Sequence, residues 1–383
     1  MLRFVIFTSL LLTTTFAKNL HIQWDNTYGA DKEEKAYGVT QTKDGGIAFA
    51  GVSRSFSLGK EDVYIAKTDS KGKLLWEKRV GKARKDIAYS IDENSKGALY
   101  VGGISKSYSQ NGDYDVYLLK LDPKGKILWG KSLGGVGKDY GYGLTATKDN
   151  GVLIVGKTKS FGHGHYDMYA IKLDENGKVL WSKTFGGEDN DEAHGVTQLN
   201  DGSLIIVGAT QSFGAGDFDF YVIKLDALGK KIWERYYGQK KADVLNCVTP
   251  SKDGGFSAAG YTRSYNSHKK DLSVIHFDKD GNILWHKIVG KQNHEEAKGI
   301  VGTGNGGVIV AGYTKSKGHG REDLYVLAFD KNGKLTFDKT YGGKKNDVAN
   351  AIDKIKDGAY IIAGESESFG KDSEYDAYLL DLK

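Results

Sequence analysis

Two acidic side chains and a serine recur along the chain at a spacing that would let them act together. The first acid recurs as Glu34, Asp86, Asp139, Asp191, Asp243, Glu295 and Asp347. The second recurs as Asp62, Asp115, Asp167, Asp219, Asp271, Asp323 and Asp376. The serine recurs as Ser55, Ser107, Ser160, Ser212, Ser264, Ser316 and Ser368. Paired carboxylates can act as general acid and base or bind calcium. We expect an architectural role instead, because a ring of identical units needs the same acceptors for its loop N–H groups in every unit.

The tryptophans define the unit that carries these residues. They are Trp24, Trp76, Trp129, Trp181, Trp233 and Trp285, and they stand 52 or 53 residues apart, with Phe337 in the seventh slot. A period this strict predicts one supersecondary unit repeated seven times. The third unit reads as four short strands, at Tyr140–Thr147, Val152–Thr158, Met168–Leu173 and Val179–Phe185, which we name a, b, c and d.

Short turns join these strands into antiparallel hairpins. The a-to-b turns carry pairs such as Asp44-Gly45 and Asn150-Gly151, which supply the positive φ angles of a tight hairpin. Four-stranded antiparallel units repeated seven times predict an all-β fold, a seven-bladed β-propeller.

The ends of the chain predict how the ring closes. The last unit has strands a to c, from Ala349 to Leu382, whereas Leu20–Thr27 is a lone d strand that contains Trp24. We therefore expect the N-terminal strand to complete the seventh blade, which leaves no open sheet edge in the ring. The tryptophans would lie on the outer strands and pack between blades.

The repeated motif is similar to known families. YGG, an acidic residue, Ala-x-Gly-Val, DGG, Gly-x-Thr-x-Ser, Asp-x-Tyr, Lys-Leu-Asp, Gly and Trp together resemble bacterial β-propeller repeats of the SBBP type. That resemblance implies an exported propeller whose family function is largely undefined. The stretch AKTDSKGKLLW, from Ala66 to Trp76, is also similar to the tryptophan-docking motif of quinoprotein propellers, although it is one residue shorter between Asp69 and Trp76. This second resemblance implies an enzyme as a less favoured possibility.

Composition bounds location and partners. Residues 1–17 have a positive charge at Arg3, an apolar run and small residues before Lys18, which predicts a secretory signal peptide cleaved after Ala17. We expect residues 18–383 to form one propeller domain. We expect it to be a monomer that is located in the periplasm or secreted. A net charge of +5 spread over interleaved signs is too weak to predict nucleic-acid binding. The single cysteine, Cys247, rules out an intramolecular disulfide.

One position changes from unit to unit where its neighbours stay the same. Near the start of strand a it reads Tyr37, Tyr89, Tyr142, His194, Asn246, Lys298 and Asn350. Because strand a is the innermost strand of a blade, we expect these seven residues to ring the mouth of the central channel and to form a candidate ligand-binding site. The alternative is that they only fill blade interfaces. Cys247 follows Asn246 in a slot for small residues, so we expect it to be a buried small apolar residue.

The b-to-c loops also vary and should lie on the same face. They offer His163, His165, His268, His319 and Arg321 as candidate contacts. His163 and His165 next to Asp167 are the residue types of a transition-metal site, but two ligands on a glycine-rich loop are a weak signal, and we predict no metal. We predict no cofactor either.

Aromatic residues follow the recurrent serine and leave two interpretations open. They are Phe56, Tyr108, Phe161, Phe213, Tyr265 and Phe369, with Lys317 in the remaining unit. They could plug the space between blades, which we favour, or stand exposed as a set of sugar-binding platforms that gain avidity from repetition.

These observations favour a noncatalytic binding or scaffold propeller that holds a protein, peptide or envelope polymer on its loop face and channel mouth. A multivalent carbohydrate-binding propeller is the main alternative, and a quinoprotein-like enzyme is the least favoured. The sequence offers no obvious set of nucleophile, base and orienting residue, and fold alone does not decide among the three.

Overall fold

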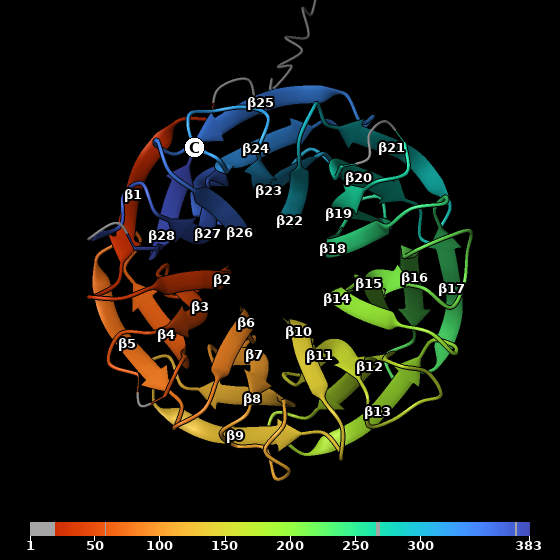
Figure 1. Ribbon diagram of the computed structural model, residues 1–383, viewed down its shortest axis with the longest axis horizontal. Helices are drawn as coiled ribbons and strands as arrows, with labels where there is room; N and C mark the ends of the chain where they lie inside the picture. Colours follow the sequence, from red (N-terminus) through yellow and green to blue (C-terminus); the bar gives the residue numbers. More distant parts are fainter. Residues whose placement is uncertain (1–19, 58, 266–268, 372–373) are drawn as a thin grey trace, which may run out of the picture.

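The chain folds into a ring of seven four-stranded antiparallel sheets (Figure 1), seen in a computed structural model that describes residues 20–57, 59–265, 269–371 and 374–383. The predicted signal peptide at residues 1–17 lies outside the described residues. No helix within the described ranges has the length and apolar character needed to cross a membrane. The seven-bladed propeller predicted from the tryptophan period is confirmed.

Each blade contributes its strands in order from the channel outward. The innermost strands, type a, are β2 (Glu34–Gln41), β6 (Asp86–Glu93), β10 (Asp139–Ala146), β14 (Asp191–Gln198), β18 (Asp243–Pro250), β22 (Glu295–Gly302) and β26 (Asp347–Lys354). The b strands are β3 (Ile47–Ser53), β7 (Leu99–Ser105), β11 (Val152–Thr158), β15 (Leu204–Thr210), β19 (Phe256–Thr262), β23 (Val308–Thr314) and β27 (Tyr360–Ser366). A short 3₁₀ turn, η1 (Lys356–Gly358), precedes β27.

The outer half of each blade is made by the c and d strands. The c strands are β4 (Asp62–Thr68), β8 (Asp115–Leu121), β12 (Asp167–Leu173), β16 (Asp219–Leu225), β20 (Asp271–Phe277), β24 (Asp323–Phe329) and β28 (Asp376–Leu382). The d strands are β5 (Leu74–Val80), β9 (Ile127–Leu133), β13 (Val179–Phe185), β17 (Lys231–Tyr237), β21 (Ile283–Val289), β25 (Leu335–Tyr341) and β1 (Ile22–Tyr28). We number the blades 1 to 7, from the one that begins with β2 to the one that begins with β26.

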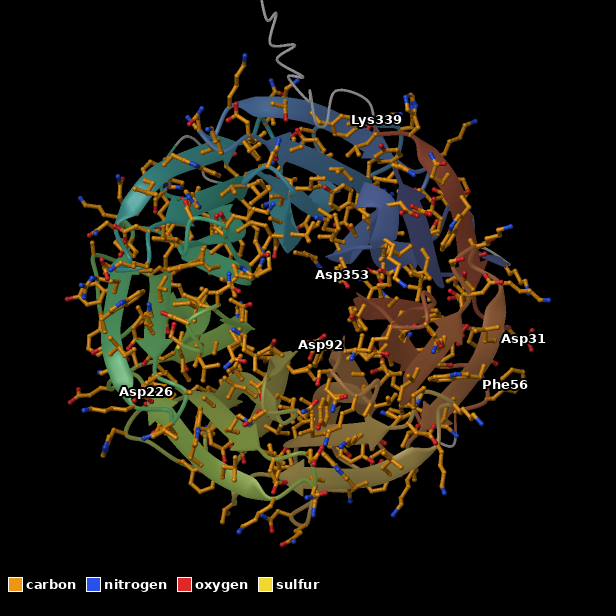
Figure 2. All side chains as sticks on the ribbon, turned by 180° about the vertical axis from the view of Figure 1, so that it is seen from behind. Asp31, Phe56, Asp92, Asp226, Lys339 and Asp353 are labelled. Atoms are coloured by element: carbon orange, nitrogen blue, oxygen red, sulfur yellow. The ribbon has the colours of Figure 1, made fainter. Side chains whose placement is uncertain are left out.

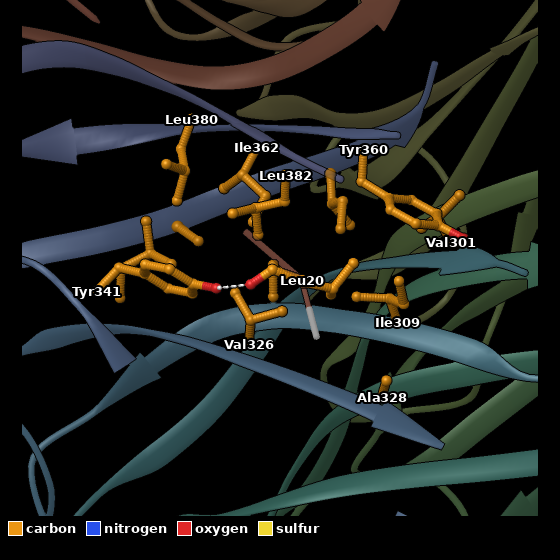
Figure 3. Packing of buried hydrophobic residues seen from close by; sticks show 14 of the residues in the cluster. Leu20, Val301, Ile309, Val326, Ala328, Tyr341, Tyr360, Ile362, Leu380 and Leu382 are labelled. Carbon is orange, nitrogen blue, oxygen red and sulfur yellow. Dashed lines mark hydrogen bonds between the residues drawn. The ribbon is translucent and has the colours of Figure 1, made fainter. Parts of the chain in front are cut away.

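The N-terminal strand closes the ring as predicted. β1 pairs antiparallel with β28, so the seventh sheet has the order β1-β28-β27-β26. Leu20, just before β1, is buried in a cluster shared by blades 6 and 7, and the Tyr341 hydroxyl donates a hydrogen bond to its carbonyl at 3.5 Å (Figure 3). The two ends of the chain therefore hold each other in place.

The hydrophobic core is divided among the boundaries between blades. Seven clusters of buried residues each combine side chains from two neighbouring blades. The b and c strands are almost fully buried and read as continuous apolar runs, such as Leu204–Thr210. Each boundary is thus a separate interface, which lets a chain of this length be stable without one oversized core.

The tryptophans pack between blades. Trp76 of blade 1 lies under the c-to-d turn of blade 2, where Gly125 has a φ of +82° and a Cβ would come within 3.0 Å of the indole. The indole N–H of Trp129 donates to the carbonyl of Glu175 in the same turn of the next blade, at 3.2 Å. This geometry explains both the tryptophan period and the glycine that accompanies it.

Candidate functional site

A β-bulge in every inner strand creates the candidate site. In β2 the pairing with β3 shifts between Ala36 and Gly38, so Tyr37 is the extra, unpaired residue. The same shift occurs in all seven a strands, and the bulged residues are Tyr37, Tyr89, Tyr142, His194, Asn246, Lys298 and Asn350. A bulge redirects the side chain of the extra residue. The structure brings all seven together around one hollow of about 230 Å³ at the axis of the ring.

The residue after each bulge is small because the inner strands converge there. A Cβ on Gly38 would lie 2.9 Å from the backbone of Ser90 in the next blade. Cys247 occupies this slot in blade 5, and its thiol donates to the carbonyl of Ala259 at 3.5 Å. The residue is half-buried at the hollow rather than fully buried as we expected, but burial of its thiol raises the pKa of that group, so Cys247 stays protonated.

Blades 1 to 3 supply a tyrosine arc, which we define as Tyr37, Tyr89, Tyr142, Tyr140 and Tyr114. The ring of Tyr89 lies 5.5 Å from that of Tyr37 and 5.6 Å from that of Tyr142. Tyr140 continues the arc away from the axis, 6.0 Å from Tyr142 and 5.5 Å from Tyr114. Burial raises the pKa of Tyr89 to about 12. The arc is therefore an uncharged surface of half-buried rings with polar hydroxyls.

Blades 3 to 5 form a polar arc that begins beside Tyr142, whose ring meets the His194 imidazole edge-on at 5.7 Å. His194 Nε2 lies 3.3 Å from Glu192 Oε2, and its Nδ1 lies 3.2 Å from Asn246 Oδ1. Lys157 donates to Glu192 at 2.7 Å. Burial alone would raise the pKa of Glu192, but the hydrogen bond from His194 and the charge of Lys157 hold that pKa at about 2.

The polar arc continues through blades 5 to 7. The Asn246 amide donates to Glu296 Oε1 at 3.0 Å, and Lys270 donates to the other Glu296 oxygen at 2.7 Å. Lys298 donates to Asn350 Oδ1 at 3.3 Å, and Asn350 in turn donates to the carbonyl of Ala36 at 3.0 Å. This last bond crosses the boundary between blades 7 and 1, so the bulged side chains form a nearly continuous collar around the axis.

The recurrent first acid and serine hold the connections between blades. Asp139 is fully buried and accepts bonds from the hydroxyls of Thr158 and Ser160, the latter at 2.6 Å, and from the Gly135 amide at 2.8 Å. The same pattern of hydroxyl and loop amide donors recurs at Asp191, Asp243 and Asp347. The donors to these carboxylates come from the protein itself.

The recurrent second acid orders the b-to-c loop of its own blade. Asp167 accepts from the amides of His163 and Gly164, each at 3.0 Å. Asp323 does the same for His319 and Gly320, at 3.1 and 3.0 Å. In both blades the loop histidine contributes its backbone, rather than its ring, to the contact with the aspartate.

The remaining loop candidates lie apart from the collar. His163, His165, His319 and Arg321 are exposed on the b-to-c loops, and His268 lies outside the described residues. Across the described ranges, no three His, Cys, Asp or Glu side chains gather in a way that could hold a metal ion. None of His163, His165, His319 and Arg321 lines the central hollow that the collar surrounds.

The aromatics that follow the recurrent serine do not plug the blades at four positions, and our favoured expectation is wrong there. Phe56, Phe161, Tyr265 and Phe369 are 73%, 46%, 42% and 46% exposed, and Figure 2 shows Phe56 at the outer rim. Tyr108 and Phe213 are half-buried against clusters between blades, as expected.

In blade 3, Phe161 is exposed because the tyrosine of strand c already occupies the space beneath. The Phe161 ring lies 5.6 Å from that of Tyr169, which is buried. Together with Ser182, Thr184 and Lys231 of the neighbouring d strands, the two rings line a rim hollow of about 490 Å³.

Two aspartates at the channel were missed by the reasoning from sequence. Asp92 and Asp353 lie at the edge of the central opening, which stays open in Figure 2 with the side chains drawn. Burial raises the pKa of Asp92 to about 7, and the negative charge of Asp353 adds to that rise. Four other blades have threonine at this position, as Thr40, Thr145, Thr197 and Thr249. The replacement of threonine in blades 2 and 7 was the signal that could have identified the pair.

Comparison with known proteins identifies relatives of parts of the sequence. An uncharacterised protein of Aquifex aeolicus is 32% identical over 139 residues, which cover 36% of this chain and 38% of that protein. The regulatory protein FlaEY of Caulobacter vibrioides is 30% identical over 179 residues, which cover 40% of this chain and 18% of that protein. The chain thus spans well under half the length of either curated relative.

Solved structures share the fold at low identity. BamB from Moraxella catarrhalis superposes with a TM-score of 0.50 and 13% identity, covering 94% of this chain and 100% of that chain. Sqt1 from Chaetomium thermophilum gives 0.53 and 11%, covering 90% and 83%. An alpha-L-arabinofuranosidase from Fusarium graminearum gives 0.51 and 12%, covering 93% and 94%. Since BamB, Sqt1 and an arabinofuranosidase share this architecture, these likenesses establish the propeller fold alone.

A family model assigns the chain more specifically. The model described as outer membrane protein assembly factor BamB matches residues 115–373. The resemblance to SBBP-type repeats stays a prediction. The match runs from the c strand of blade 2 into the last loop of blade 7, which is more than half of the chain, and the protein therefore belongs to the BamB family of β-propellers.

Proposed function

We propose that this protein is an exported, noncatalytic propeller that holds a segment of a protein partner at its channel mouth. The observation that carries the proposal is the collar of bulged residues: the backbone is the same in all seven blades, but the side chains form a tyrosine arc on one side and a polar arc on the other. Tyrosines supply large contact area with little conformational entropy to lose, and they are enriched at protein interfaces.

The electrostatics of the collar support binding rather than catalysis. Glu192 and Glu296 are each paired with a lysine and a polar neighbour, which keeps them ionised and fixed in orientation. A general acid or base needs a pKa near the working pH and access to substrate. The depressed pKa values of these two carboxyl groups argue against that role. They suit a surface that offers fixed charges to the polar groups of a partner.

The family description supports a site of action in the cell envelope. It names an assembly factor for outer membrane proteins, which is in keeping with a periplasmic or secreted scaffold. We accordingly propose that residues 1–17 are a signal peptide and that residues 18–383 act as one propeller domain.

A crosslinking experiment tests the proposal. A photoreactive amino acid at position 142 should crosslink a protein from an envelope extract, and the same group at Lys124, an exposed turn residue near the opposite face, should not. Combining Tyr37→Ala, Tyr89→Ala and Lys298→Ala with the probe should abolish the crosslink while leaving the thermal midpoint within a few degrees. Identical products from positions 142 and 124, or a crosslink that survives in the triple variant, would show that the collar does not bind the partner.

The exposed rim aromatics favour a second candidate, a carbohydrate-binding propeller. Phe161, Tyr265 and Phe369 are exposed to solvent, and the hollow beside Phe161 adds the hydroxyls of Ser182 and Thr184. Stacking of a sugar ring on such a platform, repeated around the rim, would give avidity. A glycan array with the intact protein and with the combined Phe161→Ala, Tyr265→Ala and Phe369→Ala variant separates this candidate, because only rim binding is lost in that variant and the position-142 crosslink is kept.

A further inference from the structure

On the face of the ring that carries the a-to-b turns, a side-chain oxygen from one blade closes the turn of the preceding blade. Gln41 Oε1 accepts from the Lys356 amide, Glu93 Oε2 from the Lys43 amide, and Gln198 Oε1 from the Lys148 amide, each at 2.9 Å. The accepting residue is in every case the last residue of its a strand. The chain itself thus shows which chemical group fits this place: a carboxylate or amide oxygen.

Three blades supply this group, and blade 6 is one of the four whose a strand ends in a residue without it. Its a strand ends at Gly302, which has no side chain to offer to the turn of blade 5. Within the described residues, the Lys252 amide, which corresponds to those of Lys43 and Lys148, has no hydrogen-bond acceptor. A cavity of about 270 Å³ lies here, lined in part by Lys252, Gly302 and Lys354.

The cavity is electropositive. Its lining includes two lysines, Lys252 and Lys354, and no acid among the described residues. The ammonium group of Lys354 makes no ion pair within the described part of the chain. Lys252 reaches across to the carbonyl of Gly304, as Lys148 does to that of Asn200 in blade 4.

The turn of blade 6 has lost its acid as well. Five other blades have an aspartate in this turn, as Asp44, Asp149, Asp201, Asp253 and Asp357, whereas blade 6 has Asn305. In blades 1 and 3 that aspartate pairs with a lysine of strand c, through Lys67–Asp44 at 2.6 Å and Lys172–Asp149 at 2.9 Å. Blade 6 has Ala328 in place of the lysine. Asn305 in place of the aspartate removes a negative charge that would repel an anion at this end of the cavity.

A second backbone amide at this cavity also supports an anion-binding site. The amides of Gln41 and Ala146, each the last residue of its a strand, donate to Asp353 at 3.0 Å and Asp92 at 2.8 Å in the preceding blades. The corresponding amide in blade 6 is that of Gly302, and the residue in the preceding blade is Thr249, which has no carboxylate to offer. An entering anion can therefore meet the amides of Lys252 and Gly302 together with the Lys354 ammonium group.

We propose that this cavity binds a carboxylate, the side chain of a glutamate on a bound peptide, which takes the place that Glu93 fills in blade 2. A glutamate side chain has the length and the planar oxygens that the chain uses in its own blades, and the added lysine charge favours the ionised acid over the amide. The site lies on the opposite face from the collar, so its occupancy is independent of the function proposed above.

Amide NMR of the full chain tests this assignment. N-acetyl-glutamate N-methylamide should produce saturable shifts of the Lys252 and Gly302 amides, and the neutral glutamine analogue should not. Lys354→Gln should weaken binding by about five-fold, as expected for a partly exposed ion pair. Lys344→Gln, a matched change of an exposed lysine on the other face, should leave the affinity unchanged.

The decisive variant is Gly302→Gln, which supplies the group that blades 1 and 4 already have. A Cβ at this position would lie 3.3 Å from the Pro250 carbonyl and 3.8 Å from Thr249, so the side chain can be accommodated with a small adjustment. The probe should then produce no shifts. Lys354→Glu should also abolish binding, which keeps the test valid if Gly302→Gln does not fold. Equal binding of the glutamine analogue, a preference for inorganic phosphate, or unchanged binding by a folded Gly302→Gln protein would overturn the proposal.

Discussion

Replacing Asp139 by alanine should destabilise the ring by several kcal/mol. The Asp139 carboxylate is fully buried and receives the hydroxyls of Thr158 and Ser160 and the Gly135 amide. It thereby joins the start of strand a to the end of strand b and to the connection from blade 2. Alanine leaves these three donors without an acceptor in a site that is closed to bulk water.

The size of the effect follows from the type of bond lost. Hydrogen bonds to a charged group contribute about 1.5–3 kcal/mol each, and removal of one partner from a buried charged cluster typically costs ~3–5 kcal/mol in total because the hydroxyls can partly find other acceptors. Unfolding entropy of ~2.1 cal/mol/K per residue over 383 residues gives about 0.8 kcal/mol/K. A loss of about 4 kcal/mol should therefore lower the thermal midpoint by about 5 °C.

Two serine variants supply a matched control for scanning calorimetry. Ser160 donates to Asp139, so Ser160→Ala should lower the midpoint by about 2–4 °C. In blade 6, Glu295 instead receives the Thr314 hydroxyl and the Lys291 amide, and the Ser316 hydroxyl accepts only from the amide of Asn293. Ser316→Ala should therefore cost about 1 °C. A midpoint within 1 °C of wild type for Asp139→Ala, or equal shifts for the two serine variants, would refute the architectural role of the acid.

Two further predictions concern the opposite half of the inner strands. Because the pKa of Asp92 is raised from 3.8 to about 7 in the folded protein, its contribution to stability is full below about pH 4 and is lost as the pH rises to 7. Asp92→Thr introduces the residue found in four other blades and should flatten the fall of the thermal midpoint across that pH range. Parallel curves of thermal midpoint against pH for the two proteins would contradict this prediction. Gln198→Ala removes the acceptor of the Lys148 amide and should lower the free energy of unfolding by about 1 kcal/mol. Gln211→Ala, on the loop face, is the control and should lower it by less. Equal losses of stability in calorimetry would show that the turn bond contributes nothing.

Much of the fold could be predicted because the features that specify it repeat. The tryptophan period counts the blades, and the unpaired strand that contains Trp24 indicates how the ring closes. The collar residues could be grouped by position for the same reason. The bulge that presents them could not be predicted. It arises where the seven inner strands converge on the axis, and no pair of neighbouring residues within one unit indicates that crowding. The small residue after each bulge, such as Gly38, is its only local trace.

The wrong expectation for the loop aromatics has a different cause. Phe161 and the strand c residue Tyr169 both have the size to fill the space between blades, and sequence periodicity does not rank them. In the folded chain the strand residue is fixed by its hydrogen-bonded neighbours and occupies the interior, so the loop residue is left stacked at the rim. Which of the two side chains fills the cavity depends on the position of the backbone. The repeated sequence pattern does not give that position.

Both candidate sites lie where the chain departs from its repeat. A hydrogen bond between two blades can be absent at one boundary without opening the ring, because the remaining boundaries still bury their own clusters. Positions that depart from the repeat are therefore free to change for binding while the ring stays closed. On the loop face the departures are the seven bulged side chains, and on the turn face they include Gly302, Asn305 and Ala328 of blade 6. Since different residues make the two sites on opposite faces, a variant in one should leave the other intact, and the crosslinking and NMR experiments can fail or succeed independently.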